Sequence, residues 1–448
     1  MSLPSGTQVR PGPAPVHSPK RETAGVPFPR LLLFLSCMIL TGAAFPVAPL
    51  VYSGPLAPGA RFSLEQPIQY LALAPVARLL DELSLLTSEQ HAVFLASLGV
   101  LALGWTLRRD RQCRHLARAR RLVRGACQVG WCVAIPLLTY VAGALLPRPM
   151  VRLRAAWPED VLVDFHSHTK RSHDGRWRFD LRANRRWHAA AGFDAAYITD
   201  HQAIADGRAL ADEGGNAARS PALASAELLP SPSNEGSTIL LPGIETVVPG
   251  AHINLLGVGP HHAGLFRHKR DLDTLAFAAT SEPAPLALLT LPFSLDWSPT
   301  QTPRIAAIEL SDASPRGLDF AYRHRERIMA LADSLGVAMV ASSNLHGWGA
   351  TAAAWTALRI PGWRRLDAEA LDRRIRETLQ DREWPVTVVE RQSLTPGESL
   401  VARALVLPRL LVHTWRMLTP LERLSCLLWL WIPWLLRRRA RVGTLTAA

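Results

Sequence analysis

The segment Asp164–Gly175 (DFHSHTKRSHDG) holds three histidines and two aspartates within twelve residues. Imidazole nitrogens and carboxylate oxygens are the ligands that Zn²⁺, Mn²⁺ and Fe²⁺ take in proteins. His166 and His168 alternate along an expected strand, so both side chains point the same way and can bind one ion. The chain contains no CxxC pattern, which disfavours a structural zinc site. The segment therefore predicts a catalytic type of metal site.

Further candidate ligands lie at the ends of the predicted strands. They are Asp174, Asp200, His201, Glu245, His252, Asn344 and His346. Eleven of the fifteen histidines lie between His166 and His346. A single histidine is more often an ordinary surface or core residue, but a set that recurs at strand ends favours one shared site. Clustered metals suit hydrolysis, because they lower the pKa of a bound water and stabilise negative charge on an attacked phosphoryl group.

Seven short apolar runs in the second half of the chain predict buried strands. They are VLVDF (161–165), AAYIT (195–199), TILLPG (238–243), HINLLGV (252–258), LALLTL (286–291), IAAIEL (305–310) and VAMVAS (337–342). Helical patterns lie between several of them, over 180–191 and 318–335. This alternation predicts parallel βα units, and seven of them favour a closed or nearly closed barrel over a doubly wound sheet. In either fold the chemistry belongs at the carboxyl ends of the strands.

Five motifs in this region resemble those of the PHP (polymerase and histidinol phosphatase) family of metal-dependent phosphoesterases. They are HSHTKRSHDG, YITDH, LPGIE, HINLLGV and SSNLHG, in this order. The resemblance covers roughly residues 160–350 and is greatest to the branch that acts on small molecules and nucleotides. It implies a distorted seven-stranded (β/α) barrel of the PHP type, hydrolysis of phosphate esters and up to three metal ions.

The resemblance also implies three sets of metal ligands. The first is His166, His168 and Glu245 with the acid of the last motif, the second is Glu245 and His252 with a histidine after the fifth strand, and the third is Asp174, His201 and His346. His166, His168, Glu245 and Asp200 form the expected catalytic set, in which Asp200 orients a ligand or a neighbouring loop rather than binding metal. The expected ions are Mn²⁺, Zn²⁺ or Fe²⁺.

The sequence departs from the family pattern twice. Asn344 stands where the family has aspartate, and it can offer only an uncharged carbonyl oxygen. Leu291 stands where the family has histidine, and it cannot bind metal. The second site then needs a substitute, for which His261, His262 and Asp296 are candidates. We therefore expect one or two well-held ions and at most three.

The remaining polar residues of the first loop have two interpretations each. His173 is either a ligand or a residue that positions phosphate. Lys170, Arg171 and Arg176 either attract phosphate or form an ordinary solvated basic loop.

Three long apolar segments in the first third of the chain predict about three transmembrane helices. They are Leu31–Val51, His91–Leu107 and Gly125–Leu146. A fourth run, Leu424–Leu436, contains Pro433 and three tryptophans, and it is either a span or an interfacial helix. The predicted organisation is a cytoplasmic tail (1–30), a membrane region (31–150), a PHP-like hydrolase domain (160–400) and a membrane-associated segment with a basic tail (401–448).

The charge distribution predicts the orientation of the chain in the cytoplasmic (inner) membrane. The net charge is +13, but residues 151–400 carry 27 Lys and Arg against 30 Asp and Glu, a difference of −3. The excess positive charge therefore lies beside the apolar segments. Eight arginines between Arg108 and Arg124 place that loop in the cytoplasm by the positive-inside rule. The hydrolase domain is then extracytoplasmic, and no nucleic-acid partner is expected.

The sequence thus predicts a multi-pass membrane protein that hydrolyses a phosphate mono- or diester with metal-activated water. The alternative is a catalytically degenerate PHP barrel that binds metal or a phosphorylated ligand at the membrane, as the changes at Asn344 and Leu291 suggest. The expected partners are membrane lipid and a phosphorylated small molecule, a nucleotide or a lipid headgroup.

Overall fold

The structure is a computed structural model of the chain. It describes residues 28–54, 61–112, 118–201, 238–248, 250–258, 284–294, 305–349, 351–381 and 386–446. The described helices are α1 (Phe28–Thr41), α2 (Ile68–Ala72), α3 (Ala74–Ser84), α4 (Ser88–Gln112), α5 (Arg118–Leu145), α6 (Leu181–Ala191), α9 (Pro315–Leu335), α10 (Ala368–Gln380), α11 (Leu400–Ala404), α12 (Val406–Met417) and α13 (Pro420–Thr446). The 3₁₀ turns η1 (Gly42–Ala44) and η5 (Trp363–Arg365) are short.

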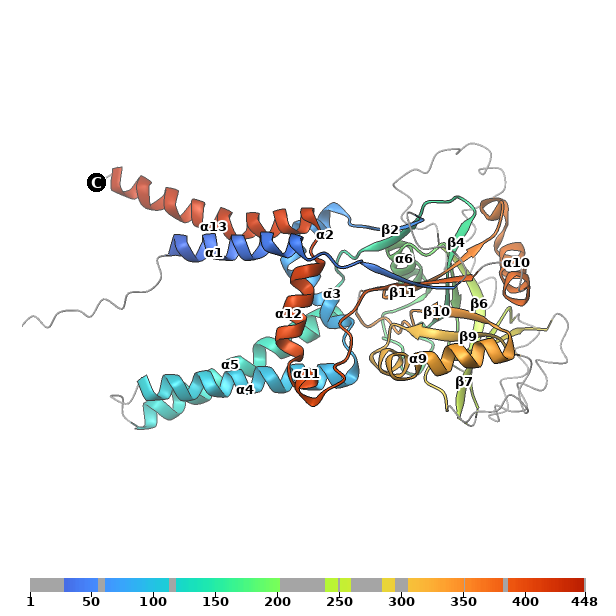
Figure 1. Ribbon diagram of the computed structural model, residues 1–448, viewed down its shortest axis with the longest axis horizontal. Coiled ribbons are helices and arrows are strands. Elements are labelled where there is room, and N and C mark those ends of the chain that lie inside the picture. Colours follow the sequence, from blue (N-terminus) through green and yellow to red (C-terminus); the bar gives the residue numbers. More distant parts are fainter. Residues whose placement is uncertain are drawn as a thin grey trace, which may run out of the picture.

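One large sheet organises the second half of the chain (Figure 1). Its strands are β1 (Leu50–Ser53), β4 (Asp160–Ser167), β5 (Ala195–Ile198), β6 (Ile239–Val248), β7 (Ala251–Leu256), β8 (Leu286–Thr290), β9 (Ile305–Asp312), β10 (Ala338–Ser342), β11 (Ala354–Arg359) and β12 (Val386–Arg391). Their order is β1-β12-β11-β4-β5-β6-β7-β8-β9-β10. A separate pair joins β2 (Phe62–Glu65) to β3 (Arg152–Ala155).

The sheet is mixed and curved. Strands β4, β5 and β6 run parallel, as do β8, β9 and β10, whereas β7 is antiparallel to both its neighbours. The curvature brings β10 against β4, β11 and β12, and a single parallel bridge joins Ser167 to Leu345. The result is a half-barrel of ten strands.

The predicted seven-stranded (β/α) barrel is therefore wrong, although each of the seven apolar runs does form a strand. One reason is the connection between β6 and β7, which is a tight turn that includes Gly250 at φ 79°. A turn this short can join only antiparallel strands, because a parallel crossover needs a dozen or more residues. The other reason is that β11, β12 and β1 extend the sheet antiparallel beyond β4.

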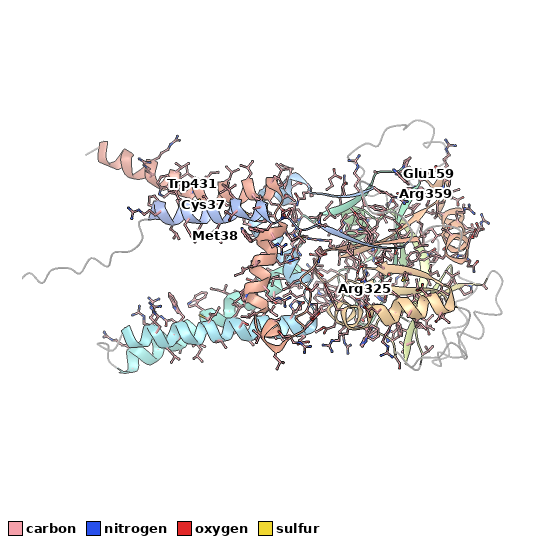
Figure 2. All side chains as sticks on the ribbon, viewed as in Figure 1. Cys37, Met38, Glu159, Arg325, Arg359 and Trp431 are labelled. Carbon is pink, nitrogen blue, oxygen red and sulfur yellow. The ribbon has the colours of Figure 1, made fainter. Side chains whose placement is uncertain are left out.

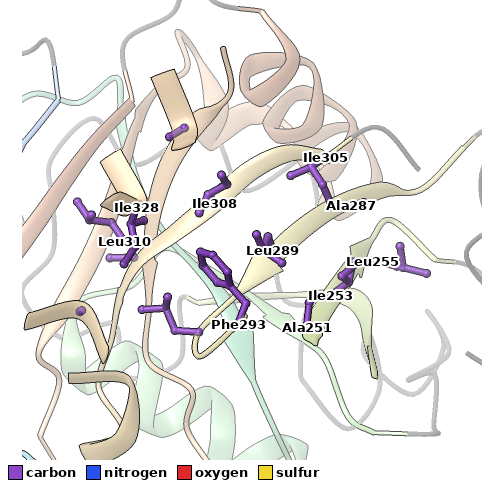
Figure 3. Packing of buried hydrophobic residues seen from close by; sticks show 14 of the residues in the cluster. Ala251, Ile253, Leu255, Ala287, Leu289, Phe293, Ile305, Ile308, Leu310 and Ile328 are labelled. Atoms are coloured by element: carbon purple, nitrogen blue, oxygen red, sulfur yellow. The ribbon is translucent and has the colours of Figure 1, made fainter. Parts of the chain in front are cut away.

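Apolar side chains of β7, β8 and β9 pack with α9 into the largest buried cluster (Figure 3). Ser314 caps α9 by accepting a hydrogen bond from the backbone of Gly317, and the helix ends at Gly336 in the left-handed conformation. Ile328 of this helix is completely buried. The predicted helix 318–335 and its stop at Gly336 agree with the observed α9.

Four helices extend from one side of the sheet and away from it: α1, α4, α5 and α13 (Figure 1). Two of them contain stretches long and apolar enough to cross a membrane, Ser88–Arg109 and Val123–Leu145. At their sheet-side ends the amphipathic helix α12 runs across them (Figure 1). Helices α1 and α13 lie side by side, and the Trp431 indole donates to Ser36 Oγ at 2.9 Å (Figure 2).

The prediction of three transmembrane helices before the catalytic region is also wrong. Helix α1 has 14 residues, so it measures about 21 Å at 1.5 Å per residue, short of the roughly 30 Å of a bilayer core. The predicted span Leu31–Val51 does not continue as helix, because Leu50 begins β1, which pairs with β12. Within the described residues only the two stretches in α4 and α5 pass the test for a span.

Candidate metal centre

The carboxylate of Glu245 on β6 lies among four histidines. Its Oε2 is 3.1 Å from His166 Nε2, 3.2 Å from His168 Nε2 and 3.4 Å from His201 Nε2. Its Oε1 is 2.6 Å from His252 Nδ1. These residues come from the ends of β4, β5 and β6 and from β7, so the parallel strands and the hairpin together bring them to one point.

The charges in this group are strongly coupled. Burial alone would raise the pKa of Glu245, but the charge of His166 and hydrogen bonds with His166 and His252 hold it well below the ordinary value. Burial alone would lower the pKa of His166, but the carboxylates of Glu245 and Glu309 raise it well above the ordinary value. Burial, together with the charge of His166, lowers the pKa of His168 to about 3. His168 is therefore neutral at physiological pH, the form that binds metal.

A second group adjoins the first and shares His168 with it. Asp174 Oδ2 lies 2.9 Å from His346 Nε2 and 3.7 Å from His201 Nε2. The rings of His168 and His346 stack with centroids 4.1 Å apart. In each group the potential ligand atoms lie within 4.8 Å of one another: His166, His168 and Glu245 in the first, and His168, Asp174, His201 and His346 in the second. Both groups could hold a metal ion.

Several buried atoms of the first group lack a hydrogen-bond partner among the described residues. His168 Nε2 lies 3.2 Å from Glu245 Oε2 but does not form a hydrogen bond with it. His166 Nδ1 lies 3.4 Å from Glu309 Oε1, and this pair does not form a hydrogen bond either. Buried polar atoms are usually paired, so these unpaired atoms need an explanation, and a bound metal ion would provide one. The donor set of imidazole and carboxylate fits a divalent metal.

Helix α6 holds the end of β4 in place from behind. Asn184 Nδ2 donates to the backbone oxygen of His168 at 3.0 Å. His188 on the same helix contacts Asp164 Oδ2 at 2.7 Å, and Asp164 also accepts from the backbone N–H of Ser343 at 2.9 Å. All five of these residues are buried. The contact between Asp164 and Ser343 joins the first motif, HSHTKRSHDG, to the last motif, SSNLHG, on the amino-terminal side of the potential metal ligands in each motif.

Asp200, predicted to orient a ligand or a loop, contacts Thr169. The backbone N–H of Thr169 donates to Asp200 Oδ1 at 2.5 Å, and the Thr169 hydroxyl donates to Oδ2 at 2.7 Å. Burial raises the pKa of Asp200. Because both oxygens are engaged, the structure places this carboxylate beneath the first loop and outside both potential metal groups.

The two positions that depart from the family pattern have different surroundings. Leu291 is 2% exposed and belongs to the apolar cluster of Figure 3. Asn344, at φ 45°, donates from Nδ2 to Asp312 Oδ2 at 3.1 Å, and its Oδ1 has no hydrogen-bond partner among the described residues. The candidate substitutes His261, His262 and Asp296 lie outside the described residues.

Two buried carboxylates on β9, Glu309 and Asp312, were not predicted from the sequence as site residues. Glu309 Oε2 accepts from the backbone N–H of Leu291 at 2.8 Å, while its Oε1 faces His166. Burial and the charge of Glu309 raise the pKa of Asp312 to about 7. The signal that could have found Glu309 is an acidic residue within the apolar run IAAIEL, because a fully buried carboxylate is rarely left unpaired.

The other residues of the first loop lie at its surface. The rings of His173 and His201 have centroids 4.9 Å apart, but His173 belongs to neither potential metal group. Lys170 and Arg171 are exposed. Arg176 is half-buried and donates from its backbone N–H to His346 O at 2.9 Å, which ties the first loop to the last motif.

Comparison with known proteins adds little to this geometry. No family model matches the chain, and no curated protein matches it. Among solved structures, the chain is similar to PsfC from Pseudomonas syringae PB-5123, with 18% identity and a TM-score of 0.33. The alignment covers 57% of this chain and 96% of that chain. A similarity of this size carries no argument about function, so the function must be argued from the site.

Proposed function

We propose that this protein is a membrane-anchored, metal-dependent phosphoesterase. The observation that carries the proposal is the pair of adjoining ligand groups that share His168. A divalent metal bound there supplies Lewis acidity, which lowers the pKa of water and neutralises charge on a phosphoryl group. The resemblance of the motifs to PHP phosphoesterases is the further reason for choosing phosphate esters as substrates.

The residues of the chain divide the work of such a site. His166, His168 and Glu245 would hold one ion, and Asp174, His201 and His346 would join His168 in holding another. Glu245 is ionised at neutral pH because its pKa is lowered, so it contributes a full negative charge to the first group. Lys170 and Arg171 are exposed on the loop after β4, which also carries Asp174, and they would attract the phosphate. Mn²⁺, Zn²⁺ and Fe²⁺ all suit this donor set.

The helices support a membrane location. Apolar side chains on α4 and α5 point outward, among them Val100 at 70% exposure and Trp131 at 66%. An exposed apolar surface of this kind on a long helix favours contact with lipid. The arginine-rich last turns of α4 and first turns of α5 lie at the ends of these helices remote from the sheet (Figure 1). By the positive-inside rule the sheet would then face outward from the cytoplasm.

The test uses the full chain purified in detergent, because β1 and the buried residues before β4 are part of the folded unit. The protein is stripped with a chelator and reloaded separately with Mn²⁺, Zn²⁺ and Fe²⁺. We expect at least one metal to restore hydrolysis of p-nitrophenyl phosphate or bis-p-nitrophenyl phosphate. If elemental analysis finds no bound metal and neither ester is cleaved, the proposal is wrong.

Reporter fusions test the orientation. One reporter is fused to a chain truncated after residue 160 and another to the complete carboxyl terminus. We expect a reporter that works only in the cytoplasm to stay inactive after residue 160. Its activity there would contradict the outward placement of the sheet.

A second candidate function is metal or phospho-ligand binding without catalysis. The buried, apolar setting of Leu291 favours it, because no ligand can come from that position. Reversion to the family pattern, Leu291→His with Asn344→Asp, separates the two functions. Activity created or greatly raised by the double reversion supports a degenerate natural site, whereas little change supports a site that is already complete.

A further inference from the structure

The two loops that carry Asp174 and His346 are attached to the sheet-side end of α5. Arg176 Nη2 donates to the backbone oxygen of Leu145, the last residue of α5, at 2.9 Å. The backbone N–H of Gly349 donates to Ala144 O at 3.0 Å. Each attachment lies two or three residues from a potential metal ligand, so the metal centre is close to the point where α5 ends.

A buried ionic network makes this attachment firm. Arg148, three residues after α5, donates to Thr351 Oγ1 at 2.6 Å and to Asp81 Oδ1 at 2.6 Å. Thr351 also donates to Asp81 at 2.9 Å. Asp81 on α3 is completely buried, so the contacts are protected from water. The loop that begins at His346 is therefore held against the base of the membrane helices.

The direction of β4 also places the metal centre on the side of the sheet that faces the four helices. Glu159 and Arg359 mark the start of β4, since Asp160 pairs with Arg359, and both lie at the end of the sheet remote from the four helices (Figure 2). Strand β4 therefore starts far from the helices and ends, at the metal centre, on their side. A metal centre at the opposite end of the strands would have faced the aqueous phase.

The exposed surface of these loops has the composition of a membrane interface. Trp177 is 69% exposed and Trp348 is 51% exposed. Arg178 lies over the Trp177 ring, 4.0 Å from its centroid, and Lys170 and Arg171 are exposed on the same loop. Tryptophan concentrates at the headgroup level, and basic residues beside a bilayer attract anionic lipids.

We propose that the phosphate ester hydrolysed at this site belongs to the headgroup of a membrane lipid, which enters from the bilayer side. This inference rests on the proposed phosphoesterase function and adds its substrate class. In the reaction, a water oxygen bonds to phosphorus, the bond between phosphorus and the ester oxygen breaks, and the departing alcohol oxygen takes a proton from that water. The same ester chemistry exists in soluble phosphates, so the test must separate the two sources.

The test compares two substrates with one headgroup. The full-length, metal-loaded protein is reconstituted in nanodiscs and given either a long-chain phosphatidate in the bilayer or its short-chain, water-soluble analogue. We expect kcat/KM for the bilayer substrate to exceed that for the soluble one by about 100-fold, because confinement to one surface raises the effective concentration. Trp177→Ala should lower this ratio severalfold. Trp157→Ala removes a tryptophan of 48% exposure at the start of β4, under Arg359, and should leave the ratio unchanged.

The outcomes are distinct. A ratio near one, with metal-dependent hydrolysis of both esters, would overturn the lipid inference and leave the phosphoesterase proposal standing. Equal effects of Trp177→Ala and Trp157→Ala on the ratio would also overturn it. Failure to hydrolyse any ester, including the p-nitrophenyl esters, would overturn both proposals together.

Discussion

Glu245 and Asp81 are both buried carboxylates with four close partners, but the partners differ in kind. Asp81 accepts hydrogen bonds from Tyr70, Arg148, Thr351 and Arg391, at 2.6 to 3.0 Å. Glu245 has four histidines around it instead. The two arginines beside Asp81 carry permanent charges, whereas histidine is charged only when it is protonated.

The difference separates a structural ion cluster from a candidate metal site. Around Asp81 the charges are compensated by the chain itself, and both oxygens have strong donors. Around Glu245 the low pKa of His168 leaves a neutral ring whose Nε2 has no hydrogen-bond partner among the described residues. A carboxylate held by arginines stabilises the fold, whereas Glu245 lies beside the neutral ring of His168, the form of histidine that binds a cation.

The largest expected effect is on stability, from Asp81→Asn. The change leaves Arg148 and Arg391 buried without a negative partner, and breaking a buried ion pair costs about 3–5 kcal/mol. Chemical denaturation of the full chain in detergent measures the loss. The control is Glu89→Gln, which removes a half-exposed acid paired with Arg323 and should cost less than about 1 kcal/mol. Equal losses for the two variants would contradict the structural role of Asp81.

Glu245→Gln should have the opposite pattern, a loss of function with little loss of stability. Removing the charge of Glu245 from the first group should lower metal affinity and hydrolysis by more than about 100-fold, since changes to outer partners already cost roughly 10–100-fold. Elemental analysis and ester hydrolysis measure the two effects. Glu159→Gln, at the exposed start of β4, is the matched control. Full retention of metal by the Glu245→Gln variant would argue against the centre.

Glu309→Gln tests whether the Glu309 carboxylate on β9 supports metal binding, as we propose for Glu245, or mainly stabilises the fold, as we propose for Asp81. Its Oε1 faces His166 Nδ1 at 3.4 Å, the place of an outer partner that orients a histidine ligand. Metal affinity, measured by competition with a chelator, should fall by about 10–100-fold. Glu326→Gln, at an exposed position of α9, serves as the control. Loss of stability with unchanged metal affinity would assign Glu309 to the structural class.

The last prediction concerns pH. Because its folded pKa is lowered, Asp81 contributes stability that is present above the ordinary carboxyl pKa of about 3.9 and lost only as the pH falls below it. The raised pKa of His166 makes that ring hold a proton that metal must displace. Between about pH 5 and 8, metal affinity should therefore rise by up to about tenfold per unit while the Asp81 contribution stays constant. Isothermal titration at several pH values would show a flat affinity if this assignment is wrong.

The strand ends and their histidines could be predicted because both are local signals. The composition of a run such as VLVDF favours a strand, and the polar residues after it then lie at the carboxyl end of that strand. The pairing of strands could not be predicted in the same way. The tight turn after β6 and the addition of β1 from residues 50–53 are decided by contacts between distant parts of the chain.

The membrane segments show the same limit. Hydropathy alone places Leu31–Val51 among the spans, yet the helix ends at Thr41 and Leu50 joins the sheet. Apolar residues are compatible with lipid and with a protein core, so composition cannot choose between them. The long apolar stretches of α4 and α5 were easier to predict as helices, because they are uninterrupted.

The sequence by itself determined which ligand types this protein can offer, because histidine, aspartate and glutamate carry their chemistry wherever they lie. Only the tertiary structure decided which of them meet. It placed Glu245 among four histidines, occupied Asp200 with Thr169, buried Leu291 in an apolar cluster and brought Glu309 to His166. It also brought the metal loops to the end of α5, since the distance between residues far apart in the chain depends on packing and not on local pattern.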